Sequence, residues 1–252
     1  MKRHLLFIAL AFIGLTFNSC VININGETVK GDGTVVTRVY NINRFDELVC
    51  ALPATVNFSI ADEYTCTVSV DENLFDYIDI KVKDDELILR QPKPKGGKYV
   101  NINATEFVID ITAPSVDEIT LAGSGDVNIL SPLSMQKLEA TIAGSGNIVF
   151  KEEVNISHLE LSVAGSGDIR IDKGTIGDLE ADIAGSGDIV SHAEAQKMEA
   201  TVMGSGDITA NVTGRLEYHI VGSGDINYYG DSEVSGKILG SGSLKSIEKP
   251  SR

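Results

Sequence analysis

The chain has 252 residues, with 25 glycines, no tryptophan and a formal net charge of −15. Its length allows one or two domains with a hydrophobic core, and its composition suits an all-β repeat better than a disordered linker. The acidity argues against a nucleic-acid partner, which requires a basic surface, and favours solubility outside the cell.

Residues 1–19 have the features of a secretory signal peptide. A basic start, MKRH, precedes an apolar run from Leu5 to Phe17, which is shorter than the roughly 20 helical residues that span a bilayer. The Asn-Ser-Cys that follows resembles a bacterial lipobox, so we expect a mature chain that begins at a lipidated Cys20. Its acyl chains would anchor the protein in the cell envelope, at the outer membrane with the leaflet left open, and residues 20–44 would form the tether and the first strand. The alternative is an ordinary secreted protein that is cut near this point.

Residues 45–120 are interpreted as a divergent N-terminal portion of a repeat domain. The stretch FDELVCALPATVNFS from Phe45 aligns with VDEITLAGSGDVNIL from Val116, and Leu52-Pro53-Ala54 then takes the place of a Gly-Ser-Gly corner. Between the two stretches, DENLFDYI predicts a short helix, and DIKVK and ELILR predict a hairpin that turns at Asp84–Asp85. Such a thicker portion would cap the exposed strand edges at one end of a solenoid.

Two features of this portion have alternative interpretations. Cys50 and Cys66 could form a disulfide, which an envelope compartment permits, or could be two small apolar residues of the core. Their spacing does not decide between these alternatives. The loop RQPKPKGGK from Arg90 carries four positive charges, and it is either a solvated turn or a contact for anionic lipid or glycan.

A Gly-Ser-Gly motif recurs seven times after this portion, at spacings of 18 to 21 residues. A fixed period of this length is typical of stacked units that cannot fold alone. Two glycines let the chain take positive φ, bend sharply and pack under the neighbouring unit, so they are predicted to form structural corners. The corner glycines are Gly123, Gly125, Gly144, Gly146, Gly165, Gly167, Gly185, Gly187, Gly204, Gly206, Gly222, Gly224, Gly240 and Gly242.

Strand-like alternation flanks the corners, as in LEATI from Leu138 and LEADI from Leu179, where every second residue is apolar. This period of two disfavours helices, and an antiparallel meander gives no reason for the same corner at one end of every unit. The sequence therefore predicts an all-β fold, a right-handed β-helix-like solenoid with about 18–21 residues per coil. It would form a single domain over residues 45–246, with the repeats in 121–246 and a C-terminal tail in 247–252.

The alignment of the coils also predicts columns of core residues in which large side chains lie beside small ones. Tyr218, for example, falls between Ala200 and Gly236 in its column. A large residue beside small ones avoids overpacking of a stacked core.

Two outward columns carry the candidate binding groups. The residues after the corners would form a ladder with a spacing of about 4.8 Å, either of cation ligands or of Asx-type turns that accept local backbone N–H groups. The glutamates before the corners would repel one another, which raises their pKa. They would form either a solvated face or a weak cation-bridged contact with a glycan or a neighbouring molecule. The ladder consists of Asp126, Asn147, Asp168, Asp188, Asp207, Asp225 and Ser243, and the glutamates are Glu139, Glu160, Glu180, Glu199 and Glu217.

The sequence contains no recognisable catalytic constellation. It lacks a Ser-His-Asp order, HExxH, a P-loop and GxGxxG, and its acidic residues are periodic. His158, His192 and His219 lie at different phases of the repeat, so they are not expected to form a metal cluster. We therefore expect no enzymatic activity, no cofactor and no metal.

Three motifs together resemble the head GIN domain family, whose members are described as auto-transporter adhesins: the FDEL opening at Phe45, the DENLFDYI segment, and the GSGDI and GSGNI corners. The resemblance extends from about Phe45 to Leu244. It implies a secreted or lipid-anchored envelope protein with a β-helix-like fold, and it supplies no catalytic residues. We expect a non-catalytic envelope lipoprotein that acts as an adhesin or interaction scaffold for a protein or glycan partner. The alternatives are a periplasmic regulatory or stress-related lipoprotein that binds proteins and, less favoured, a carbohydrate-active β-helix enzyme.

Overall fold

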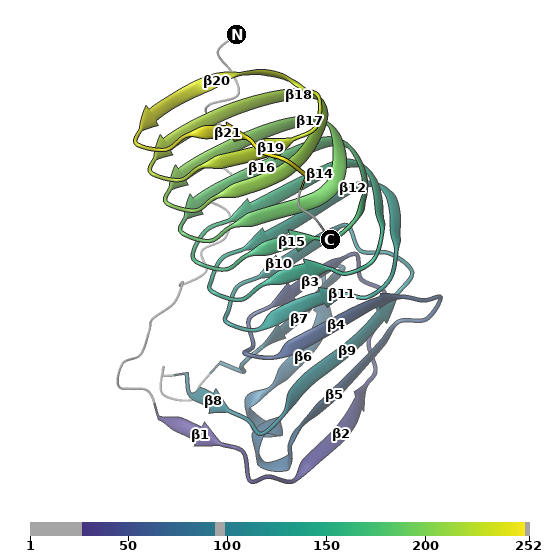
Figure 1. Cartoon of the computed structure of the whole chain (residues 1–252). Coiled ribbons are helices and arrows are strands. Elements are labelled where there is room, and N and C mark those ends of the chain that lie inside the picture. Colours follow the sequence, from purple (N-terminus) through teal and green to yellow (C-terminus); the bar gives the residue numbers. More distant parts are fainter. Residues whose placement is uncertain (1–26, 94–98, 250–252) are drawn as a thin grey trace.

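The structure, a computed structural model, describes residues 27–93 and 99–249. It is nearly all β, and its strands wind into a solenoid of about 6 turns (Figure 1). The all-β, β-helix-like fold predicted from the repeats is therefore confirmed. The predicted signal peptide and Cys20 lie outside the described residues, as does the centre of the basic loop, residues 94–98.

Each coil of the repeat region consists of a short strand that follows a corner and a longer strand that leads to the next corner. The strands of adjacent coils pair in parallel and in register, so that Leu138 pairs with Leu159, and Leu159 with Leu179. Alternate side chains of each strand enter the core, which is why the period of two predicted this arrangement. The strands that lead to a corner are β10 (Glu118–Leu121), β12 (Leu133–Ile142), β14 (Val154–Val163), β16 (Gly174–Gly185) and β20 (Glu233–Gly240), and those that follow a corner are β11 (Asp126–Ile129), β13 (Ile148–Phe150), β15 (Ile169–Ile171), β19 (Ile226–Tyr229) and β21 (Leu244–Ser246). In β17 (Ile189–Gly204) and β18 (Ile208–Gly222) the two strands of a coil are continuous.

The coils become shorter toward the C-terminus, and one side of the coil accounts for the change. Eight residues lie between the core positions Ile129 and Leu138, but only five lie between Ala210 and Leu216, which occupy the same two columns. The corner and the segments beside it keep a constant length. In the late coils this side has the fewest residues, and β17 and β18, of 16 and 15 residues, continue around the bend, where the register of their pairing shifts.

The core column that contains Tyr218 is arranged as predicted. Ala200 pairs with Tyr218, and Tyr218 pairs with Gly236. A Cβ atom on Gly236 would collide with the backbone carbonyl oxygen of Tyr218 and would lie 2.6 Å from two carbons of the Tyr218 ring. Glycine at this position therefore leaves the space that the ring occupies.

The N-terminal portion forms a cap at one end of the solenoid (Figure 1). Its first coil has the predicted register, with Glu47 paired to Glu118. The DENLFDYI segment contains a 3-10 helix, η1 (Glu72–Tyr77), and the predicted turn at Asp84–Asp85 joins two antiparallel strands. Antiparallel pairing of β2 with β5 and of β5 with β9 completes the cap. Its strands are β1 (Thr28–Lys30), β2 (Val35–Tyr40), β3 (Glu47–Cys50), β4 (Thr55–Ile60), β5 (Thr65–Asp71), β6 (Asp79–Lys83), β7 (Glu86–Arg90), β8 (Asn101–Asn103) and β9 (Phe107–Ala113).

A buried carboxylate holds three segments of the cap together. The side chain of Asp71, at the end of β5, accepts hydrogen bonds from the backbone N–H of Gly33 at 2.8 Å and of Thr105 at 2.7 Å. Burial by itself would raise the pKa of Asp71, but these hydrogen bonds favour the ionised form and the pKa is lowered. The β1–β2 and β8–β9 loops are therefore both tied to β5.

Cys50 and Cys66 are free and buried, so the disulfide considered above is not present and the core alternative applies. Cys50 lies on β3, which pairs with β7 and β10, whereas Cys66 lies on β5, which pairs with β2 and β9. The two strands are not neighbours. Burial raises the pKa of the Cys50 thiol to about 11 and that of the Cys66 thiol to about 12, which keeps both protonated and unreactive.

The corners require glycine for two different reasons. The first glycine of the later corners has positive φ, for example 139° at Gly204. Gly187, the second glycine of its corner, has no such φ, but a Cβ there would collide with the carbonyl oxygen of Gly167 in the preceding coil. The prediction of positive φ is therefore wrong for this second glycine, and the close approach of stacked backbones is the reason for it.

Candidate functional site: the glutamate face

One column of glutamates runs along an outward face of the solenoid. The sequence identified five members, and the pairing register adds Glu118, Glu47 and Glu86, which continue the column into the cap. With strands about 4.8 Å apart, the column extends over roughly 35 Å. We call it the glutamate column, and in spatial order it consists of Glu86, Glu47, Glu118, Glu139, Glu160, Glu180, Glu199 and Glu217.

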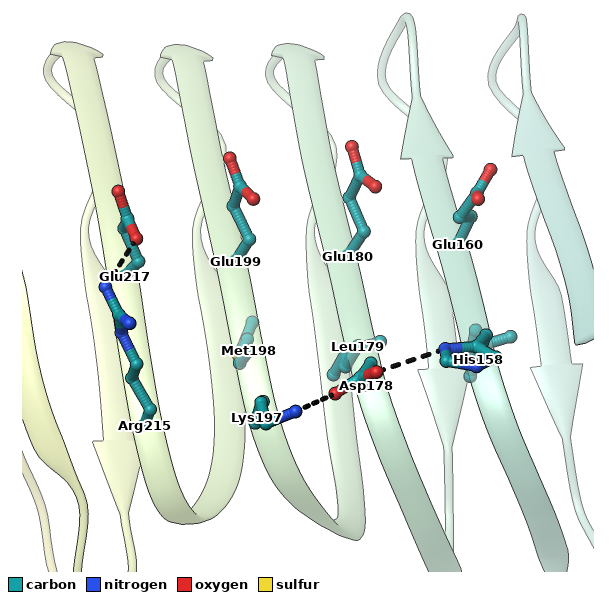
Figure 2. A pocket seen from close by; sticks show the side chains of 11 residues that line it. His158, Glu160, Asp178, Leu179, Glu180, Lys197, Met198, Glu199, Arg215 and Glu217 are labelled. Atoms are coloured by element: carbon teal, nitrogen blue, oxygen red, sulfur yellow. Dashed lines mark hydrogen bonds and ion pairs between the residues drawn. The ribbon is translucent and has the colours of Figure 1, made fainter. Parts of the chain in front are cut away.

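Strand alternation and parallel register together create the column. Leu179 and Ala181 are 2% and 0% exposed, so Glu180 between them points outward. The same residue type at the same phase in the next coils places the carboxylates side by side, as Figure 2 shows for Glu160, Glu180 and Glu199. The sheet geometry therefore holds like charges next to one another at a distance where they repel.

A second outward column, two residues before the glutamates, contributes basic side chains. Lys137 Nζ lies 3.2 Å from Glu160 Oε1, and Arg215 Nη2 lies 3.0 Å from Glu217 Oε2 (Figure 2 shows the second pair). All four side chains are at least 39% exposed, so each pair contributes little to stability. This column consists of Lys137, His158, Asp178, Lys197 and Arg215, and together with the glutamate column it defines the glutamate face.

Asp178 interrupts the basic column between His158 and Lys197. Its Oδ1 lies 3.2 Å from Lys197 Nζ, and its Oδ2 lies 3.1 Å from His158 Nδ1 (Figure 2). Within the described ranges, Glu180 and Glu199 have no basic partner within 4.0 Å. The middle of the glutamate face therefore keeps uncompensated negative charge.

Two shallow grooves lie along this face. The first has a volume of about 300 Å³ and is lined by the charged side chains of the face (Figure 2), whereas the side chains of Leu179 and Met198 beside it are buried in the core. The second, of about 510 Å³, lies closer to the cap beside Glu47, Glu118 and Lys137. Both are open surface grooves with acidic walls, which suits contact with an extended or convex partner better than enclosure of a small molecule.

Three carboxylates of the face, those of Glu47, Glu139 and Glu180, have a raised pKa. The pKa of Glu180 is raised, first because the side chain is partly buried and then because acidic neighbours such as Asp182 and Glu160 repel its charge. The pKa of Glu139 is raised by the same two causes in the same order. The predicted direction is confirmed for Glu139 and Glu180, but desolvation and not repulsion is the largest cause at both residues.

The ladder of residues after the corners holds the coils together. Asp188 Oδ1 accepts a hydrogen bond from the Asp207 N–H at 2.8 Å, and Asp207 Oδ1 accepts one from the Asp225 N–H at 2.7 Å. The donor belongs to the next coil, so the interpretation as a local Asx turn is wrong. Asn147 Oδ1 accepts from the Asp168 N–H at 3.0 Å in the same way, which shows that the ladder requires an oxygen acceptor and not a charge.

The described residues do not bring metal ligands together. Within residues 27–93 and 99–249, no group of three or more His, Cys, Asp or Glu side chains could hold a metal ion. His158 lies on the glutamate face, His192 Nδ1 lies 3.1 Å from the hydroxyl of Tyr229, and His219 pairs in register with Thr201. The ladder residues instead accept backbone hydrogen bonds from the next coil.

Residues 44–232 match the family described as "Putative auto-transporter adhesin, head GIN domain". The chain belongs to this family. Among solved structures, the head GIN protein is similar to a "Putative lipid binding protein" of Parabacteroides distasonis, with 30% identity over 88% of this chain and 100% of that one and a TM-score of 0.77. It is also similar to a "putative adhesin" of Bacteroides fragilis, with 25% identity over 87% and 100% of the two chains and a TM-score of 0.77. A "putative adhesin" of Parabacteroides distasonis is 26% identical over 88% and 100% of the two chains, with a TM-score of 0.73.

No curated protein sequence matches this head GIN protein. In the part of the chain that the structure describes, no helix combines the length and the hydropathy that a membrane crossing requires. The family description indicates a protein of the cell envelope or surface.

Proposed function

We propose that this head GIN protein is a lipid-anchored, non-catalytic adhesin of the cell envelope, and that its glutamate face binds a basic surface of a partner protein. The observation that carries the proposal is the unbroken column of eight glutamates. The family description and the names of similar structures support the adhesin role, and the anchor rests on the signal-like sequence that ends at Cys20.

The electrostatics of the face explain why a basic partner fits it. Partial burial and mutual repulsion disfavour the ionised form of Glu139 and Glu180. Lysine or arginine side chains of a partner would occupy the space between these carboxylates and remove the repulsion. An acidic face of this length also accelerates the approach of a basic partner, and the effect is strongest at low salt.

The binding test compares two triple variants that remove the same charge from different faces. The protein carries Cys20→Ser in all cases so that it stays in solution, and the probe is poly-L-lysine in a titration calorimeter. Glu160→Gln, Glu180→Gln and Glu199→Gln together should weaken binding about tenfold, since three pairs of roughly 0.5 kcal/mol are lost. Equal weakening by the control, in which Glu152, Glu153 and Glu194 become glutamine, would show that net charge and not the glutamate face is responsible. Binding of an acidic polysaccharide only in the presence of Ca²⁺ would instead indicate a cation-bridged glycan contact.

The location test uses intact cells. Replacement of Cys20 by serine should release the mature protein from the membrane fraction, because the thioether that carries the lipid cannot form. Protease added to intact cells should degrade the wild-type protein if it faces outward as an adhesin. Protection in intact cells together with degradation in opened cells would favour the periplasmic regulatory alternative.

A further inference from the structure

The last coil of the solenoid leaves one edge of its sheet unpaired. β20 pairs with β18 on one side and β21 pairs with β19, and no strand within the described ranges pairs with their other side. Figure 1 shows β20 as the outermost strand at the end opposite the cap. A regular strand with free backbone donors and acceptors is a template for another strand.

The apolar interior is also open at this end. Ile238 of β20 is 38% exposed, whereas Ile220, its partner in register one coil earlier, is 1% exposed. Val234 is likewise partly exposed, whereas Leu216, its partner in register one coil earlier, is fully buried. β20 therefore presents the cross-section of a hydrophobic core that has no covering layer among the described residues.

The hydrogen-bond phase of the coils identifies the free backbone groups. The N–H groups of Glu139 and Ala143 donate to the preceding coil, and in the pairing register these positions correspond to Ser235 and Leu239. Successive residues of a strand direct their N–H and C=O groups to opposite sides. The groups on the free edge are therefore those of Val234, Gly236 and Ile238, which are also the residues that face the core.

We propose that β20 pairs antiparallel with β20 of a second copy, so that two solenoids join end to end about a two-fold axis at Gly236. In this register Val234 lies opposite Ile238 of the second copy, and Gly236 lies opposite its own counterpart. All three positions direct backbone groups to the free edge, so the pairing forms about six hydrogen bonds. It also continues the core across the junction, and it needs no change in the backbone of either copy.

Charge complementarity favours a second copy as the occupant of this edge. The outward residues of β20 include Glu233 and Lys237, and in the proposed register Ser235 faces Lys237 of the second copy. Lys237 then lies diagonally next to Glu233 of the other chain, within reach of an ion pair, and the two-fold axis repeats the contact. The junction lies at the end of the solenoid and does not involve the glutamate column. The proposed dimer is therefore independent of the proposed function and is tested separately.

The first experiment measures self-association by sedimentation velocity, with the mature chain carrying Cys20→Ser. A reversible dimer should form within a range of about 1 to 200 μM. Ile238→Pro removes an N–H that points away from β18, which edge strands tolerate, and should raise the dissociation constant more than tenfold. Ile238→Val keeps the N–H and serves as the matched control, with a dissociation constant within about threefold of the wild type. A monomer at every concentration, or a dimer that Ile238→Pro leaves intact, would overturn the proposal.

A charge exchange tests the register without a change of backbone. Lys237→Glu places two glutamates diagonally across the junction and should weaken the dimer severalfold. The double variant Glu233→Lys with Lys237→Glu should restore it. Failure of this restoration contradicts the register. Slow, concentration-independent hydrogen exchange at the Ile238 amide of a monomer would assign the edge to another segment of the same chain and would also refute the proposal.

Discussion

The ladder of side chains after the corners allows a direct test of how the coils are held together. Asp188 Oδ1 accepts from the Asp207 N–H at 2.8 Å, and both residues are partly buried. Asp188→Ala removes the acceptor and leaves that N–H without its partner, which costs about 1–3 kcal/mol. For a domain of this size each kcal/mol lowers the melting temperature by about 2–4 °C, so we expect a decrease of about 5 °C.

The matched variant is Asp188→Asn, because Asn147 already performs this role in the wild-type ladder through its Oδ1. It should retain a melting temperature close to that of the wild type. Differential scanning calorimetry measures the global effect, and hydrogen exchange at the Asp207 amide measures the local one. If the alanine variant melts like the wild type, or if the asparagine variant is destabilised as much as the alanine variant, then the inter-coil hydrogen bond is not what the ladder contributes.

Three further predictions concern the corner, the glutamate face and the cap. Gly187→Val introduces a Cβ against the Gly167 carbonyl oxygen and should destabilise the fold by about 1–3 kcal/mol in chemical denaturation; an unchanged midpoint would contradict the close stacking. Glu180 has a raised folded-state pKa, so its destabilising effect is absent below the unfolded pKa and fully present above the folded pKa. Repulsion between neighbours about 4.8 Å apart is roughly 0.9 kcal/mol in bulk water and a few tenths after screening. Glu180→Gln should therefore raise the melting temperature by about 1–2 °C at pH 7, and the gain should disappear in acid and become smaller at high salt, which screens the repulsion; a loss of stability at every salt concentration would argue against the stacked column. Asp71 has a lowered pKa, so its stabilisation is present above the unfolded pKa and lost as the pH falls; Asp71→Asn should melt earlier at neutral pH and lose less stability on acidification, and an unchanged acid response would show that this carboxylate does not tie the cap.

The coils could be predicted to the residue because every unit repeats the same short pattern. Identical corners fix the alignment, and alternation then determines which side chain is buried, so the pairing of Tyr218 with Gly236 followed from the sequence. The pairing of Glu47 with Glu118 also followed from the alignment of the two stretches. The extension of the glutamate column to Glu86 did not, because the hairpin that carries Glu86 has no Gly-Ser-Gly corner to align. The antiparallel hairpin of β6 and β7 was predicted from its turn at Asp84–Asp85, whereas the antiparallel pairing of β5 with β2 and β9 was not.

Sequence patterns also do not reveal which neighbour a side chain reaches. The ladder residues were correctly placed in one column, but a carboxylate at this position could bond within its own coil or to the next, and only the three-dimensional arrangement distinguishes the two. Likewise, the sequence does not distinguish Gly204, which has positive φ and also stacks closely on Gly185, from Gly187, which is required for close stacking alone.

The gradual shortening of the coils has a consequence for folding fidelity. Units with the same corner and nearly the same strands could pair one coil out of step, and such a slip would satisfy most backbone hydrogen bonds and core contacts. The side of the coil that shrinks from eight residues after Ile129 to five after Ala210 makes adjacent coils fit each other better than coils further apart. A chain that skipped a coil would place coils with different numbers of residues next to each other, and their strands would not align on this side of the solenoid. The decrease in coil length thus specifies which coil lies next to which. The seven nearly identical corners cannot do so.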